Sequence, residues 1–189
     1  MPGRDPLPIR VPNSAMTAQP VTPVGDDRRR AFNCGSGPFA LEVRDAIRRA
    51  TWFSAEPSLR AIRFDRGDET VGYAVMIVER WEHPTWKSRP KEAYLYLEWV
   101  AVSVHFRGQD PAARPGERFS DVILRHVTEE IAPRYPQIVG VLGIVRSGNV
   151  PAISLLARHG FAADEGGPFN DRLTGAPSMI YRLLLPGRA

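Results

Sequence analysis

Apolar residues recur along this chain with two different spacings. Between residues 38 and 53, and again between residues 119 and 131, they recur every three or four positions, which predicts amphipathic helices. Alternating or continuous apolar runs predict strands at about 59–64, 71–79, 93–104, 138–145 and 178–185. A short helix is predicted at 150–159, between the last two strands. This order of elements predicts an α/β fold around a mixed sheet.

The first 30 residues differ from the rest of the chain. They contain very few large apolar residues and six prolines, Pro2, Pro6, Pro8, Pro12, Pro20 and Pro23. Such a segment buries too little surface to offset its ordering entropy, so we expect a disordered tail over 1–30 and one folded domain over 31–187. The tail ends in Arg28–Arg30, which is either a solvated run of charge or a contact for RNA or an acidic partner.

The composition narrows the classes to which the protein can belong. A chain of 189 residues with 43% hydrophobic residues can bury the core of one domain. Of the 25 basic residues only Lys87 and Lys91 are lysines, so we interpret the net charge of +4 as an arginine bias rather than a nucleic-acid surface. Cys34 is the only cysteine, which favours a reducing, cytoplasmic setting. No apolar run reaches the ~20 residues of a membrane span, and we expect no metal, because no His/Cys cluster has zinc-ligand spacing.

Two segments carry the candidate chemistry. In the first, residues 97–109, a buried strand ends in Val100-Ala101-Val102 and runs into the turn Arg107-Gly108-Gln109. An N–H group that a bulged or splayed strand releases can polarise a carbonyl, and unpaired N–H groups at a helix N-terminus bind phosphate. This segment therefore predicts a buried strand that runs into a turn of the kind that binds phosphates.

The second segment, residues 149–161, predicts a capped helix. Asn149 suits the N-cap, Pro151 the first turn and Gly160 the left-handed exit. The spacing Asn-x-x-Ala-Ile-x-Leu ending on Gly-Phe is completed by Ala152, Ile153, Leu155 and Phe161. The helix follows a buried strand and begins about forty residues after the first segment.

In order and spacing, these segments resemble the two acyl-CoA-binding motifs of the GNAT N-acetyltransferase superfamily. The resemblance covers about residues 31–186. It implies a GNAT-like fold, with a mixed central sheet of about six to seven strands flanked by helices on both faces. It also implies an acyl-CoA-dependent N-acyltransferase, which transfers an acetyl group from acetyl-CoA, or another acyl group from its CoA thioester, to an amine in a ternary complex. The acceptor would be a small-molecule or protein amine.

The resemblance implies cofactor contacts in both motifs. The main chain of Val100 and Val102 would contact the pantetheine arm and the thioester, and Asn149 would contact the CoA arm. The expected cofactor-binding residues are Val100, Ala101, Val102, Arg107, Gly108, Gln109, Gly116, Arg118, Phe119, Ser120, Asn149 and Ala152.

The phosphate turn departs from the family pattern, Gln/Arg-x-x-Gly-x-Gly/Ala. Counted from Arg107, Asp110 occupies the fourth position and would repel phosphate, and Pro111 has no N–H to donate. In a second register, residues 110–115 are an inserted loop and Gly116–Ser120 leads into the helix. We prefer this register, in which Arg118 would bind a phosphate with two N–H groups. The alternative is that the turn has lost CoA binding.

The catalytic groups are also incomplete. Leu156 occupies the position of the tyrosine that typically protonates the leaving thiolate in this family. Glu98 is the candidate general base, because a carboxylate in an apolar strand is costly unless it is paired or functional. An ion pair with a neighbouring arginine is the competing interpretation, and His105 and His159 are weaker candidates.

Two other functions fit the same residues. Phe32-Asn33-Cys34-Gly35 resembles the entry of the toxin branch of GNAT enzymes, which acetylate aminoacyl-tRNA; nucleic acid is expected as a partner only in that case. The other alternative is a catalytically inactive GNAT-fold scaffold. The segments about 82–92 and 163–177 are the expected walls of an acceptor site, with Trp86, Asp164, Glu165, Phe169 and Asp171. Such a fold would also allow a homodimer through an exposed sheet edge.

Overall fold

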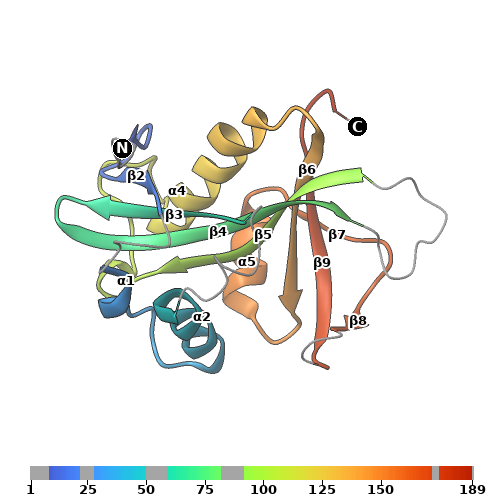
Figure 1. Ribbon diagram of the computed structural model, residues 1–189, viewed down its shortest axis with the longest axis horizontal. Coiled ribbons are helices and arrows are strands. Elements are labelled where there is room, and N and C mark those ends of the chain that lie inside the picture. The colour runs from blue at the N-terminus through green and yellow to red at the C-terminus, as the bar shows by residue number, and fades with distance from the viewer. Residues whose placement is uncertain (1–8, 22–27, 50–58, 82–91, 172–174, 189) are drawn as a thin grey trace, which may run out of the picture. The chain divides into compact units, whose positions relative to one another are not determined.

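A computed structural model describes residues 9–21, 28–49, 59–81, 92–171 and 175–188 (Figure 1). The α-helices of the described residues are α1 (Arg28–Ala31), α2 (Pro38–Arg49), α4 (Phe119–Arg125) and α5 (Val150–Arg158). The strands are β1 (Ile9–Arg10), β2 (Thr17–Pro20), β3 (Leu59–Arg66), β4 (Glu69–Trp81), β5 (Glu92–Val102), β6 (Ile138–Arg146), β7 (Ala162–Ala163), β8 (Phe169–Asn170) and β9 (Pro177–Leu184). The elements predicted from the apolar spacing are all present.

The strands of the described residues form one mixed, nine-stranded sheet. Its order is β1-β2-β3-β4-β5-β6-β9-β7, and β8 pairs with β9. β5 and β6 run parallel, whereas β9 is antiparallel to β6, β7 and β8. The α/β prediction is confirmed, but six to seven strands was too low a number. The additional strands are the N-terminal pair β1 and β2 and the two-residue strands β7 and β8. All four are too short for apolar residues to recur at a recognisable spacing.

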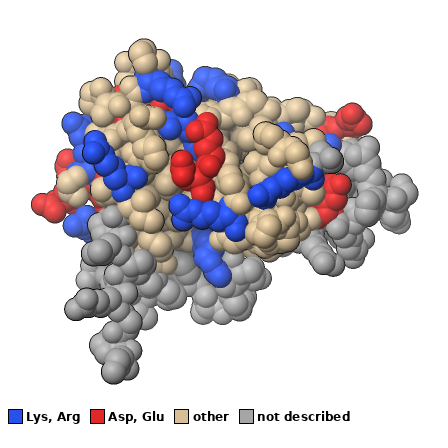
Figure 2. All heavy atoms as spheres, turned by 90° about the horizontal axis from the view of Figure 1, so that it is seen from above, with Lys and Arg blue, Asp and Glu red and all other residues tan. Residues whose placement is uncertain are grey.

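The described chain divides into two compact units. Unit 1 consists of Met1–Val75 and Trp99–His126, and unit 2 of Met76–Glu98 and Val127–Ala189. No helix of the described residues has the length and apolar character needed to cross a membrane. On the face shown in Figure 2, basic and acidic side chains are interspersed, so the positive net charge does not gather into one patch there.

In unit 1, helices cover both faces of the sheet (Figure 1). One face carries a buried cluster that includes Ile47 of α2, with Phe32, Cys34, Tyr73 and Ala101. Neighbouring residues of a strand point to opposite faces, and a Cβ on Gly72 would lie 2.9 Å from Ile123 Cδ1 of α4. The same Cβ would collide with the Ala101 carbonyl oxygen. Glycine at position 72 therefore allows β4 to approach both β5 and α4.

The N-terminal segment is ordered where the structure describes it. β2 pairs with β3 from Thr17 to Pro20, and Val11 and Met16 are buried. The disordered tail predicted over 1–30 therefore does not extend over residues 9–21, while residues 1–8 and 22–27 lie outside the described part of the chain. The expectation from composition was wrong for two reasons. Two of the few large apolar residues in this segment, Val11 and Met16, are buried in the core. Pro20 stands at the end of its strand, where the missing N–H costs little.

The helix predicted over 119–131 changes its winding part-way. α4 ends at Arg125, and residues His126–Ile131 continue as a π-helix. His126 is buried, and its ring meets Phe64 edge-on with centroids 5.6 Å apart. A histidine on this apolar stripe is thus part of the unit 1 core.

Unit 2 is built around β6. Its core cluster contains Tyr94, Leu142 and Ile180, one residue from each of β5, β6 and β9. On the other face of β6, α5 buries Leu155 and Leu156. The predicted helix 150–159 and strand 178–185 are thus confirmed to within one residue at each end.

Candidate functional site

Strand β5 separates from β6 part-way along its length. The two strands are paired from Ala93 with Ile138 to Tyr96 with Leu142, where the register ends. β5 nevertheless continues to Val102, and β6 continues to Arg146 while paired with β9. Within unit 2, the register of β5 on β6 therefore ends before either strand does.

The backbone direction at the end of β5 is given by its contacts with β4. Ser103 N–H donates to the Val71 carbonyl at 2.7 Å, and the Ala101 carbonyl faces Gly72. Because backbone groups alternate in direction along a strand, the N–H and carbonyl of Val102 point away from β4. This direction is compatible with the thioester contact expected of Val102. The backbone of Ala101 does not share the direction of Val102, because the Ala101 carbonyl faces β4. Its side chain is buried.

Buried and half-buried side chains alternate along most of β5, although Tyr94 is buried and Trp99 is half-buried against this alternation. Leu95, Leu97 and Ala101 are buried. The alternate residues from position 96 onward are half-buried, namely Tyr96, Glu98, Val100 and Val102. Glu98 thus lies on the accessible face of the strand, as a residue that exchanges protons with a substrate must.

The turn after β5 is held by contacts within unit 1. Arg107 Nη2 donates to the Cys34 carbonyl at 2.5 Å, and its guanidinium would collide with a Cβ on Gly35, which has φ +113°. From the sequence we expected Arg107 to bind the cofactor. In the structure its guanidinium is bonded to the backbone carbonyl of Cys34. Gly108 lies exposed, and its carbonyl accepts from Phe119 N–H at 3.3 Å.

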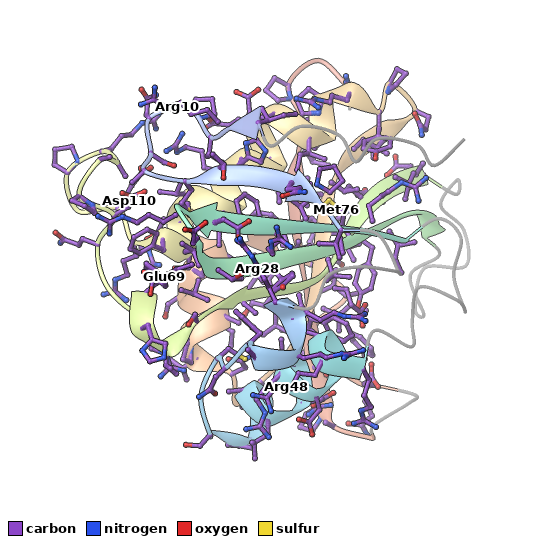
Figure 3. All side chains as sticks on the ribbon, turned by 60° about the vertical axis from the view of Figure 1, so that its left-hand side comes forward. Arg10, Arg28, Arg48, Glu69, Met76 and Asp110 are labelled. Atoms are coloured by element: carbon purple, nitrogen blue, oxygen red, sulfur yellow. The ribbon has the colours of Figure 1, made fainter. Side chains whose placement is uncertain are left out.

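The inserted loop is a closed hairpin. Gln109 and Arg118 form an antiparallel bridge at its base, and Asp110 N–H donates to the Glu117 carbonyl at 3.2 Å. Asp110 is only 3% exposed, and its Oδ1 accepts from Ala112 N–H at 3.0 Å. Figure 3 labels Asp110 in this loop. The carboxylate that was expected to repel phosphate is therefore satisfied inside the loop.

Two further carboxylates are bonded at the base of the loop and in the first turn of α4. Glu117 accepts two hydrogen bonds from Arg125, at 3.0 and 3.1 Å, and Asp121 Oδ2 accepts from Arg118 N–H at 3.0 Å. In contrast, Arg114 and Arg118 are exposed. The loop thus turns its acids inward and presents arginines to solvent, which suits an anionic ligand.

The start of α4 offers fewer N–H groups than the motif implied. Phe119 N–H is bonded to Gly108, and its ring packs edge-on against Phe106 at 5.4 Å. Phe119 is therefore a core residue rather than a phosphate donor. Ser120 is half-buried, and no described residue accepts its N–H. Gly116 is exposed with φ +84°, a conformation that favours glycine.

The second motif is folded as its spacing predicts. Asn149 caps α5, with its Oδ1 accepting from Ala152 N–H at 3.4 Å. Gly160 ends the helix with φ +77°, and Phe161 behind it is buried. The oxygen of the Asn149 side chain is thus used by the cap, which leaves its amide N–H groups for any contact with the CoA arm.

Leu156 is buried against β6. It is 4% exposed, and its Cδ1 would lie 3.7 Å from a Cβ on Gly143. Gly143 directly follows Leu142, the last β6 residue paired with β5. At the position expected for a tyrosine, the chain therefore has an aliphatic side chain, which cannot act as a general acid.

The segment expected to form an acceptor wall is partly structural. The Asp164 side chain is 1% exposed and pairs with Arg182 at 2.6 Å, so it is not available to an acceptor amine. Phe169 packs against the core cluster of unit 2. Trp86 lies outside the described residues. Among the described residues, no group of three or more His, Cys, Asp and Glu could hold a metal ion.

Cys34 is a buried thiol with a predicted pH response. Burial raises its pKa, although the guanidinium of Arg107 acts in the opposite direction, and Sγ donates to the Ala40 carbonyl at 3.3 Å. A raised pKa keeps the thiol protonated at neutral pH, so we expect iodoacetamide to alkylate native Cys34 far more slowly than the unfolded chain at about pH 7. The rate should rise with pH above the range of an ordinary thiol. Equal rates for native and unfolded protein at neutral pH would contradict this.

Solved structures resemble this chain over most of its length. No protein-family model and no curated protein matches the sequence. An acetyltransferase from Thermus thermophilus aligns with TM-score 0.57 and 19% identity over 90% of this chain and 97% of that one. A protein assigned to the GNAT acetyltransferase family from Desulfovibrio desulfuricans aligns with TM-score 0.58 and 16% identity over 89% and 98%. The chain has the GNAT fold.

Other structures with this fold were solved with different ligands. Arabidopsis thaliana NAA60, solved with a bisubstrate analogue, aligns with TM-score 0.56 and 15% identity over 91% of this chain and 99% of that one. The toxin AtaT, solved with acetyl-methionyl-tRNAfMet, aligns with TM-score 0.57 and 16% identity over 89% and 94%. At these identities the GNAT fold is shared, and the acceptor of this chain is not given by the likeness.

Proposed function

We propose that this protein is an acyl-CoA-dependent N-acyltransferase that transfers an acetyl group from acetyl-CoA to an amine. The observation that carries the proposal is the end of β5–β6 pairing at Tyr96 and Leu142, after which both strands continue. A strand that leaves its neighbour releases backbone donors in the middle of a sheet. Such donors are what an acyl thioester needs for polarisation of its carbonyl.

The residues of the chain have distinct roles in this mechanism. Glu98, half-buried on the accessible face of β5, takes a proton from the acceptor amine, directly or through water. Val102 N–H, which points away from β4, hydrogen-bonds the thioester oxygen, and Val100 contacts the pantetheine arm. Arg118 and the Ser120 N–H bind phosphate oxygens. Acyl-CoA supplies the activated acyl group and leaves as CoA after the amine has attacked.

Leu156 limits the rate of this chemistry. A leucine donates no proton, so the thiolate of CoA is protonated by water or departs unprotonated. Because a thiolate is a fairly good leaving group, we expect slow turnover rather than none. The single cysteine, Cys34, fits a protein that works in the reducing cytoplasm.

Calorimetric titration with acetyl-CoA and with free CoA tests the proposal. We expect dissociation constants on the order of micromolar, and Arg118→Ala should weaken both about fivefold, because it removes one exposed charge from the phosphate loop. Arg134→Ala replaces another exposed arginine, which lies in unit 2 outside the motifs; it is the matched control and should leave both constants unchanged. If neither compound binds, the proposed acyltransferase activity is wrong, and a GNAT-fold scaffold is indicated instead.

Transfer to aminoacyl-tRNA is the second candidate, because AtaT, whose structure was solved with acetyl-methionyl-tRNAfMet, has this fold. Against it, Arg28 in the arginine run, labelled in Figure 3, forms ion pairs with Asp65 at 3.6 Å and Asp68 at 3.8 Å. These pairs offset part of the positive charge that would attract RNA. Titration with tRNA at two salt concentrations separates the candidates, since a steep salt dependence indicates phosphate contacts.

A further inference from the structure

A turn near the N-terminus is bonded to the inserted loop of unit 1. The turn joins β1 to β2, and it is closed by Val11 N–H on the Met16 carbonyl at 3.0 Å and by Met16 N–H on Ser14 Oγ at 2.9 Å. Ala15, at its end, donates its N–H to Asp110 Oδ2 at 3.2 Å, across 95 positions of sequence. Figure 3 shows the loop of Asp110 beside the strand that carries Arg10.

Asp110 connects this turn to both arms of the loop. One carboxylate oxygen accepts from Ala15 and the other from Ala112 at 3.0 Å. The backbone N–H of Asp110 donates to Glu117 at 3.2 Å, and its carbonyl accepts from Ala113 at 3.1 Å. Asp110 is almost fully buried, so the two bonds to its carboxylate, from Ala15 and Ala112, are made to a desolvated group and are stronger than bonds between neutral groups.

The rest of the loop is anchored to α4. Glu117 is bonded to Arg125, whose side chain is 6% exposed, and Asp121 holds the N–H of Arg118. The loop is therefore fixed at one end by α4 and at the other by the N-terminal turn through Asp110. Arg118, which forms the bridge with Gln109, depends on both attachments for its position.

We propose that the N-terminal hairpin, residues 9–20, is part of the cofactor-binding apparatus, and that Asp110 is the positioning residue that transmits its support to Arg118. This inference rests on the proposed binding of CoA by the loop. Without the Asp110 carboxylate, the loop loses its attachment to the hairpin, and the phosphate-binding groups are no longer preorganised. The hairpin thus acts on CoA affinity without contacting CoA.

Asp110→Asn tests this role, because the amide keeps the size of the side chain but cannot accept at its NH₂ group. We expect the variant to bind CoA about tenfold more weakly, as loss of one hydrogen bond to a buried charge predicts. Asp164→Asn is the matched control: Asp164 of unit 2 is 5% exposed, and its carboxylate is bonded to Arg182 and to the Gly166 N–H, which belong neither to the loop nor to the hairpin. It should lower the midpoint of thermal unfolding and leave CoA affinity unchanged.

The outcomes separate the two proposals. If the unsubstituted protein binds CoA and Asp110→Asn binds it equally well, the positioning role is wrong and the proposed function stands. If the unsubstituted protein does not bind CoA, both fail. Equal weakening by Asp164→Asn would show a general effect of destabilisation and would also overturn the positioning role.

Hydrogen exchange tests the same link in the unsubstituted protein, should Asp110→Asn fail to fold. Coupling between two sites is reciprocal, so saturation with CoA should slow exchange of the Ala15 amide severalfold. The Met16 amide, which is bonded to Ser14 within the turn, should change less. An unchanged Ala15 rate in protein saturated with CoA would overturn the inference.

Discussion

Replacement of Glu98 by glutamine is expected to lower turnover of an accepted amine about a hundredfold, within the range typical of a removed general base. Glutamine fits the half-buried position on β5 but takes no proton from the acceptor. CoA affinity should not change, because Glu98 is assigned no contact with the cofactor. Release of CoA thiol, measured over a panel of primary amines at saturating acetyl-CoA, gives kcat, and calorimetry gives the affinity.

Glu92→Gln is the control for this substitution. Glu92 lies on the same strand and the same side-chain alternation, is exposed, and accepts from the Tyr94 hydroxyl at 2.7 Å. Its replacement removes a carboxylate from β5 without touching the proposed mechanism, so kcat should be unaffected. A kcat for Glu98→Gln within about twofold of the original would remove Glu98 from the mechanism and leave the ion-pair interpretation.

Replacement of Arg125 by methionine is expected to reduce the free energy of unfolding by about 3 kcal/mol, the lower end for breaking a buried pair. The Arg125 side chain is 6% exposed and that of Glu117 is 16% exposed, and two hydrogen bonds join them. Without the guanidinium, the Glu117 carboxylate is left largely buried and uncompensated. Urea unfolding followed by circular dichroism measures the change.

The double variant Arg125→Met, Glu117→Met separates the pair from its surroundings. Removal of both charges leaves no uncompensated ion, so most of the lost stability should return. If the single variant lost less than about 0.5 kcal/mol, the ion pair would be no more important than an ordinary surface pair. A double variant as unstable as the single one would instead assign the effect to the packing of the arginine stem.

Local patterns in the sequence were sufficient for the elements and for one motif. The two-residue and three-to-four-residue apolar periods predicted the strands and helices, because these elements bury one side at a fixed spacing. Asn149, Pro151 and Gly160 predicted both ends of α5, since each satisfies a backbone requirement within one turn of the helix. The family resemblance rested on these local features, and the GNAT fold is confirmed.

The loop between residues 107 and 120 shows where local patterns were insufficient. Asp110 was interpreted as repelling phosphate, yet its carboxylate is buried against Ala15, 95 positions away. Phe119 matched the motif, yet its N–H is bonded to Gly108. The effect of a charge or donor depends on which groups surround it, and such long-range neighbours leave no period in the sequence.

By itself, the sequence determined the α/β class, the position of each principal element and the replacement of the motif tyrosine by Leu156, because these depend on residue type and spacing. Only the tertiary structure decided that β1 and β2 join the sheet, that the pairing of β5 with β6 ends after Tyr96, and that the loop turns its acids inward. These features depend on pairing between strands and on hydrogen bonds between distant segments. Their energies come from contacts that form only when the chain is folded.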